Sequence, residues 1–79
     1  MSRASRLCTI IDKINECRLE VEELRDEMQQ WYDNMPENLQ SSSKADSIQE
    51  CVDSLEEVIS SIEEVESNAE NVEFVGMYN

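Results

Sequence analysis

The sequence predicts an all-α protein: an antiparallel, coiled-coil-like hairpin of two long helices that dimerises into a four-helix bundle and ends in a short extended tail. Apolar residues recur at alternating spacings of three and four in both halves of the chain, which is the pattern of a heptad repeat. The only proline and a run of serines lie between the halves. A chain of 79 residues also has too small a core for a lone hairpin to be very stable.

The first helix is expected over residues 5–33. Ile11 and Tyr32 lie at e positions and widen the apolar stripe of this helix. Pro36 disfavours a helical conformation at Met35 and removes a backbone donor, so the helix should end just before these residues. The a and d positions of the first helix are Leu7, Ile10, Ile14, Cys17, Val21, Leu24, Met28 and Trp31.

The second helix is expected over residues 44–70. Val52 and Ile59 lie at e positions, which indicates a helix that contacts more than one neighbour. Ser43 and Ser47 each precede an acidic residue by three positions, so both are candidates for a capping box at its start. The a and d positions of the second helix are Ile48, Cys51, Leu55, Val58, Ile62, Val65, Ala69 and Val72.

The loop between the helices is expected over residues 34–43. A connection this short between helices of equal length favours an antiparallel hairpin, so residues 1–79 should form a single domain. Asn34 is expected to cap a short turn over residues 36–39.

Two adjacent aromatic residues precede the loop. Trp31 and Tyr32 are expected to cover the open end of the bundle, where the Trp N–H and the Tyr O–H reach water or loop carbonyls. Met35 and Leu39 should close that end as lids.

The tail, residues 71–79, is apolar enough to predict a contact. Gly76 argues against a helix there. Phe74, Met77 and Tyr78 are the candidate contact residues. Two interpretations stay open: the tail packs on its own hairpin or on a dimer mate, or it binds another protein.

Each predicted helix has an apolar stripe that is too wide for one neighbour to cover. A homodimer with twofold symmetry is the simplest way to bury the remainder, and docking into a groove of a host protein would serve the same purpose. The residues expected at the centre of the oligomer seam are Ile14, Val21, Leu24, Leu55, Val58 and Ile62.

The charge of the chain is distributed unevenly. Lys and Arg number 6 against 19 Asp and Glu, which gives a net charge of −13. Residues 1–25 have a net charge of zero, whereas residues 26–79 hold Lys44 as their only base. Such a surface repels nucleic acid and anionic membranes and attracts basic proteins, so we expect a basic protein partner and no direct nucleic-acid or membrane binding.

The acidic residues of the second helix are the main candidates for partner binding. One interpretation is that they merely keep the outer side of a bundle in water. The other is that they dock onto a basic protein in the manner of a nucleic-acid mimic, and the absence of interspersed lysines favours it. The candidate partner-binding residues are Asp46, Glu50, Asp53, Glu56, Glu57, Glu63, Glu64, Glu66 and Glu70.

The sequence offers little for catalysis or cofactors. It contains no His, no CxxC pair, no EF-hand loop and no glycine-rich phosphate loop, so we expect no enzyme activity, no metal and no cofactor. Cys17 and Cys51 lie at d positions and are expected in the core, whereas Cys8 lies at an exposed b position. Three cysteines and no apolar leader predict a reducing, cytoplasmic location.

Three stretches carry a resemblance to a known group of proteins. They are WYDNMPENLQ at 31–40, SIQECVDSLEEVISSIEEVES at 47–67 and VEFVGMY at 72–78. With them, the region from Val21 to Tyr78 resembles small, acidic, helical proteins encoded by bacteriophages. The resemblance implies a non-enzymatic inhibitor of host defence in the host cytoplasm, including the anti-CRISPR type and DNA mimics, and it assigns no catalytic residue.

The expected function is therefore a non-enzymatic, acidic interaction protein that inhibits a host nucleic-acid-handling or defence protein. The alternative is a structural or assembly coiled coil whose function is oligomerisation. A cage for a small nucleotide is a weaker alternative, since only the arginines of the first helix could hold phosphates. Those arginines are Arg3, Arg6, Arg18 and Arg25.

Overall fold

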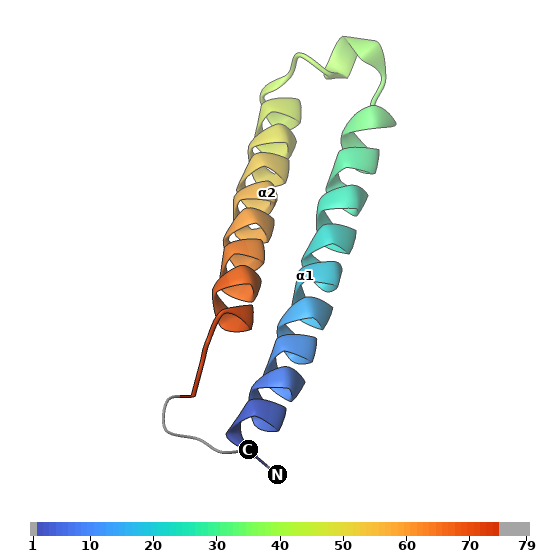
Figure 1. Cartoon of the computed structure of the whole chain (residues 1–79). Helices are drawn as coiled ribbons and strands as arrows, with labels where there is room; N and C mark the ends of the chain where they lie inside the picture. Colours follow the sequence, from blue (N-terminus) through green and yellow to red (C-terminus); the bar gives the residue numbers. More distant parts are fainter. Residues whose placement is uncertain (1, 75–79) are drawn as a thin grey trace.

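The computed structural model describes residues 2–74 and consists of two long antiparallel helices (Figure 1). Helix α1 spans Arg3–Asp33, a short 3-10 helix, η1, spans Glu37–Leu39, and α2 spans Ser43–Glu70. The helices lie side by side along their length, and the Cα atoms extend over 64 × 16 × 11 Å. The predicted all-α hairpin is confirmed, and both helices begin slightly earlier than expected.

The ends of α1 follow from local chemistry. Ser2 caps its first turn, because the Ser2 Oγ accepts a hydrogen bond from the Ser5 amide at 3.1 Å. The helix ends at Asp33, as the following proline predicts. The expected capping role of Asn34 is wrong, since its own amide bonds to Gln30 O at 3.0 Å and no side chain caps η1.

The loop is held by side chains that bond to the backbone. Gln40 Nε2 donates to Met35 O at 3.2 Å and to Tyr32 O at 3.5 Å, which ties the loop to the last turn of α1. Ser42 Oγ donates to Leu39 O at 2.6 Å. These contacts satisfy carbonyl groups that the ends of α1 and η1 leave without a helical partner.

The start of α2 differs from the prediction by one residue. Ser42 is the cap, and its Oγ accepts a hydrogen bond from the Ala45 amide at 3.3 Å. The predicted caps, Ser43 and Ser47, both lie inside the helix, where Ser47 Oγ donates back to Ser43 O at 3.1 Å. The serine run at 41–43 contains several possible caps, and the hydrogen-bonded loop selects Ser42.

The core lies on one side of each helix. The buried side chains among the described residues all belong to α2, and they are Ala45, Ile48, Val52 and Ile59. They occupy a and e positions, and the half-buried residues of α1, such as Ile11, Ile14 and Val21, do the same. The helices therefore meet along their a and e positions, and not along the a and d positions that the heptad spacing favours.

Candidate functional site

The contact between the helices fixes where every other heptad position points. An α-helix turns by about 100° per residue, so d and e positions lie on opposite sides of an a position. Because a and e positions form the contact, the d positions of each helix point away from it. The two helices are antiparallel and use the same positions, so both d rows emerge on the same side of the hairpin.

These d rows form an exposed surface that we call the apolar face. Leu24 is 52% exposed, and Val58 is 44% exposed. Both belong to the predicted oligomer seam, and the single hairpin leaves them exposed. Cys17, which is predicted to lie in the core of the bundle, is exposed in the single hairpin, and Cys51 is half-buried. The apolar face comprises Ile10, Cys17, Leu24 and Trp31 of α1 and Cys51, Val58 and Val65 of α2.

The opposite side of the hairpin carries a polar network at the helix contact. Arg18 donates from Nε to Glu66 Oε1 and from Nη1 to Glu22 Oε2, both at 2.7 Å. Asn15 Nδ2 donates to Glu66 Oε2 at 3.2 Å. The side chains of Arg18 and Glu66 are only 19% and 13% exposed. Glu66 is thus a structural residue, and its assignment to the partner-binding set is corrected.

The network shifts the pKa values of both charged partners. The pKa of Glu66 is lowered, above all by the hydrogen bond from Asn15, against the opposing effect of burial, and Arg18 lowers it further. The pKa of Arg18 is raised by its hydrogen bonds to Glu66 and then to Glu22. Both shifts favour the charged forms, so the pair stays ionised at neutral pH.

The remaining predicted partner-binding residues are all exposed on α2, and we call them the acidic face. Ion pairs between described residues join Arg18 to Glu22 and Glu66, and Arg25 to Asp26. None of these pairs uses a carboxylate of the acidic face. The acidic face comprises Asp46, Glu50, Asp53, Glu56, Glu57, Glu63, Glu64 and Glu70.

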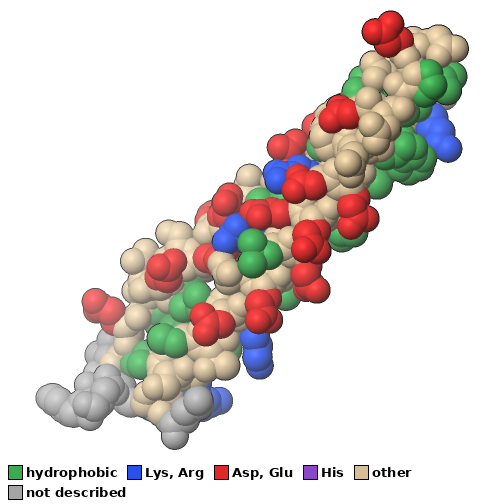
Figure 2. Space-filling view, turned by 90° about the vertical axis from the view of Figure 1, so that its right-hand side faces the viewer, with side chains coloured by type: hydrophobic (Ala, Val, Ile, Leu, Met, Phe, Trp, Pro, Cys, Tyr) green, Lys and Arg blue, Asp and Glu red, His purple; other side chains and the backbone are tan. Residues whose placement is uncertain are grey.

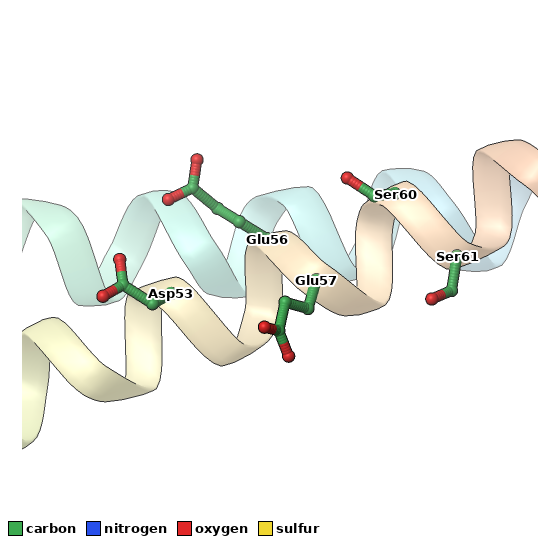
Figure 3. A pocket seen from close by; sticks show the side chains of 5 residues that line it. All are labelled: Asp53, Glu56, Glu57, Ser60 and Ser61. Atoms are coloured by element: carbon green, nitrogen blue, oxygen red, sulfur yellow. The ribbon is translucent and has the colours of Figure 1, made fainter.

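The middle of the acidic face surrounds a shallow depression. It is open to solvent, with a volume of about 580 Å³. Figure 3 shows Glu56 and Glu57 leaving α2 in different directions, with Asp53 one turn before them and Ser60 and Ser61 one turn after. Acidic side chains also run along the length of the molecule on the side seen in Figure 2, with few basic ones among them.

The loop end of the hairpin differs from the prediction. Trp31 is 47% exposed, and Lys44 Nζ lies 5.2 Å from the centre of its ring, which is a cation–π contact. Tyr32 is half-buried, and Leu39 is 46% exposed, so Leu39 does not act as a lid. Trp31 continues the apolar face, whereas Met35 is half-buried beside Tyr32 and the nearby core residues Ala45 and Ile48 are buried.

The other end of the hairpin holds part of the tail. Phe74 is half-buried and lies with Leu7 and Ile10 around a small cavity of about 260 Å³ at the start of α1. The described part of the tail thus returns to its own chain. The predicted contacts of Met77 and Tyr78 lie outside the described residues.

No family model matches the chain, and neither the curated proteins nor the solved structures provide a match. Within residues 2–74, no three Cys, Asp or Glu side chains are placed to hold a metal ion. Neither helix of this region is apolar enough over a sufficient length to cross a membrane.

Two contacts escaped the sequence analysis, and only one of them left a signal. Arg18 and Glu66 occupy e positions with charges of opposite sign, and Arg25 is the one other charged residue at an e position of the two helices. An antiparallel pairing of Arg18 with Glu66 predicts the observed register. The cation–π contact of Lys44 with Trp31 depends on the path of the loop, which no spacing in the sequence encodes.

Proposed function

We propose that this protein is a non-enzymatic inhibitor that binds a basic, nucleic-acid-handling or defence protein through the acidic face of α2. The supporting observation is that the eight carboxylates of this face are exposed and that the ion pairs of the described residues use other carboxylates. Unpaired carboxylates are available to a partner's Lys and Arg side chains. The protein acts as a homodimer in the host cytoplasm and binds no nucleic acid itself.

The charge pattern supports a protein partner of basic character. Residues 45–79 contain ten acids and no base. A face that served only solubility would be expected to mix both signs, as helices commonly do with pairs one turn apart. The resemblance to small acidic phage proteins points to the same class of inhibitor, with a mode of action like that of a DNA mimic.

The test compares two variants that carry the same change of charge on different helices. Both variants and the unaltered chain are used to capture partners from a nuclease-treated host lysate, followed by elution with increasing salt. The first variant neutralises the acidic face with Asp53→Asn, Glu56→Gln, Glu63→Gln and Glu64→Gln. The control neutralises exposed acids of α1 with Asp12→Asn, Glu16→Gln, Glu23→Gln and Glu27→Gln.

We expect the unaltered chain and the α1 control to capture the same partner. The α2 variant should fail to capture it. Binding should also weaken steeply with salt, because it depends on exposed charges. A partner that the α2 variant retains, or whose binding ignores salt, contradicts the proposal.

A second candidate is an assembly protein whose function is oligomerisation, and the apolar face is the observation that favours it. This candidate predicts that reversing charges on the acidic face leaves biological activity intact, whereas a charge on the apolar face abolishes it. The reversal combines Asp53→Lys, Glu56→Lys, Glu63→Lys and Glu64→Lys.

A further inference from the structure

We propose that a second copy of this chain covers the apolar face, with α1 of each copy packed on α2 of the other and both loops at the same end of a four-helix bundle. This inference rests on the homodimer of the proposed function and deepens it, because it names the surface and the arrangement. Four features of the hairpin support it: the area of the apolar face, a groove on α2, the register of the two helices and the distribution of charge.

The apolar face has the area that a stable dimer needs. Its row on α1 runs from residue 10 to residue 31, about 32 Å at 1.5 Å per residue. Its row on α2 runs from residue 51 to residue 65, about 21 Å. At roughly 10 Å of width per helix, the two rows cover roughly 530 Å² on each copy. A dimer would bury roughly 1,060 Å² in total, just above the ~1,000 Å² that a specific interface should exceed.

A groove on α2 provides holes for the side chains of another helix. Its volume is about 460 Å³. In a coiled coil, residues i, i+3, i+4 and i+7 surround the hole that receives one side chain of the neighbouring helix. The groove contains two such sets of four residues, one starting at Ser54 and the other at Val58, and they share Val58 and Ser61. The small serines at its margin let a second backbone approach closely. The groove is lined by Ser54, Glu57, Val58, Ser61, Ile62 and Val65.

The register of the hairpin places matching side chains at the same height. Glu66 contacts Asn15 and Arg18, so Val65 lies level with Cys17. One heptad further along α1, Leu24 lies level with Val58. If the twofold axis runs parallel to the helices, each residue of the second copy keeps its height. Leu24 of the second copy then lies over the groove at Val58.

The same register pairs large residues with small ones. Two heptads from the level of Cys17, Trp31 lies level with Cys51, the smallest side chain of the apolar face on α2. The bulky ring of one copy therefore faces a thiol of the other. This complementarity favours a second copy of the chain over an unrelated partner, because the face matches itself.

Charge distinguishes between the two possible ways of stacking the hairpins. Stacking α2 on α2 would bring together two segments with ten acids and no base each, residues 45–79. Stacking α1 on α2 instead places α2 against residues 3–33, which hold five bases and eight acids. Like charges at an interface cost several kcal/mol, so the second arrangement is favoured.

The arrangement is tested by disulfide cross-linking between differently substituted chains. Leu24→Cys and Val58→Cys are made separately in a chain that carries Cys8→Ser, Cys17→Ala and Cys51→Ala, then mixed and oxidised. Position 24 is more than half exposed in the single hairpin, so its substitution leaves the fold intact. Ser60→Cys, on the outer side of α2, is the matched control. Light scattering of the unaltered chain gives the oligomeric state.

We expect light scattering to find a particle of twice the chain mass. Oxidation of the mixture should give a covalent dimer that joins position 24 of one chain to position 58 of the other. Mixtures that contain Ser60→Cys should give no such product.

A dimer that instead links Leu24→Cys to a chain retaining only Cys17 shows α1 stacked on α1. That result overturns the arrangement and leaves the homodimer standing. A dimer in which none of these links forms overturns the apolar face as its interface. A monomer at micromolar concentration overturns the homodimer and this arrangement, whereas binding through the acidic face is tested separately by the capture experiment.

Discussion

At the scale of single residues, Glu66 links stability to pH. Its pKa in the folded chain lies below the ordinary value of 4.5, mainly because Asn15 donates a hydrogen bond to the carboxylate. The unfolded chain therefore binds this proton more readily than the folded chain. The stabilisation is present above the unfolded pKa and is lost as pH falls through the folded pKa. We predict that Glu66→Gln lowers the thermal midpoint at pH 7 and that its difference from the unaltered chain shrinks below pH 4.5.

The matched control for this prediction is Glu63→Gln, which removes the same charge from an exposed position on α2. Protonation of many carboxylates also relieves repulsion in this acidic chain, and comparison with the control removes that general effect. Circular dichroism melts between pH 3 and pH 7 measure both variants. Equal destabilisation by the two substitutions would show that the network around Glu66 adds nothing specific.

At the scale of helices, the sequence predicts the elements better than the faces they use. The two heptad rows and Pro36 are enough to place both helices and the end of α1. The rows do not determine which flank of an a position meets the neighbouring helix, because both the d and the e positions include apolar residues. Val52 and Val58 are chemically identical, yet the first is 1% exposed and the second is 44% exposed. The choice follows from the path of the loop and the pairing of Arg18 with Glu66.

Because a positions lie in the contact between the helices and d positions lie on the apolar face, we predict different results for two neighbouring substitutions on α2. Leu55 lies at an a position in the contact between the helices, so Leu55→Asp should unfold the hairpin and dissociate the dimer together. Val58 lies on the apolar face, so Val58→Asp should dissociate the dimer and retain more helix than Leu55→Asp. Circular dichroism at 222 nm and light scattering follow the two effects separately. Equal loss of helix in both variants would mean that the hairpin does not fold without its mate.

At the scale of the whole molecule, the proposed bundle separates the two acidic faces. Each α2 packs on α1 of the other copy, so the two acidic helices lie at diagonal corners. Eight carboxylates along roughly 42 Å of α2 are spaced about 5 Å apart, against about 1.7 Å for the charges of duplex DNA. In this arrangement the two acidic faces do not combine to approach the charge density of duplex DNA. The dimer instead presents two equivalent, moderately acidic docking faces.

The natural cysteines report on dimerisation without any substitution. Cys8 and Cys17 are both exposed in the single hairpin, but only Cys17 belongs to the apolar face. Dimerisation through this face should bury Cys17 and leave Cys8 accessible. We predict that alkylation of Cys17 slows as the protein concentration rises, whereas alkylation of Cys8 keeps its rate. Tryptic cleavage after Lys13 places the two cysteines on different peptides, so mass spectrometry measures both rates in one sample.

The dimer equilibrium determines how the alkylation rate of Cys17 depends on protein concentration. Protection requires the dimer, so the alkylation rate of Cys17 should reach half of its dilute value near the dissociation constant found by light scattering. The Val58→Asp variant supplies the control, because its Cys17 should react at the dilute rate at every concentration. Equal rates for Cys8 and Cys17 at concentrations where light scattering finds a dimer would place the interface elsewhere. Protection of Cys17 that persists at every dilution would instead mean that this thiol is covered within a single chain.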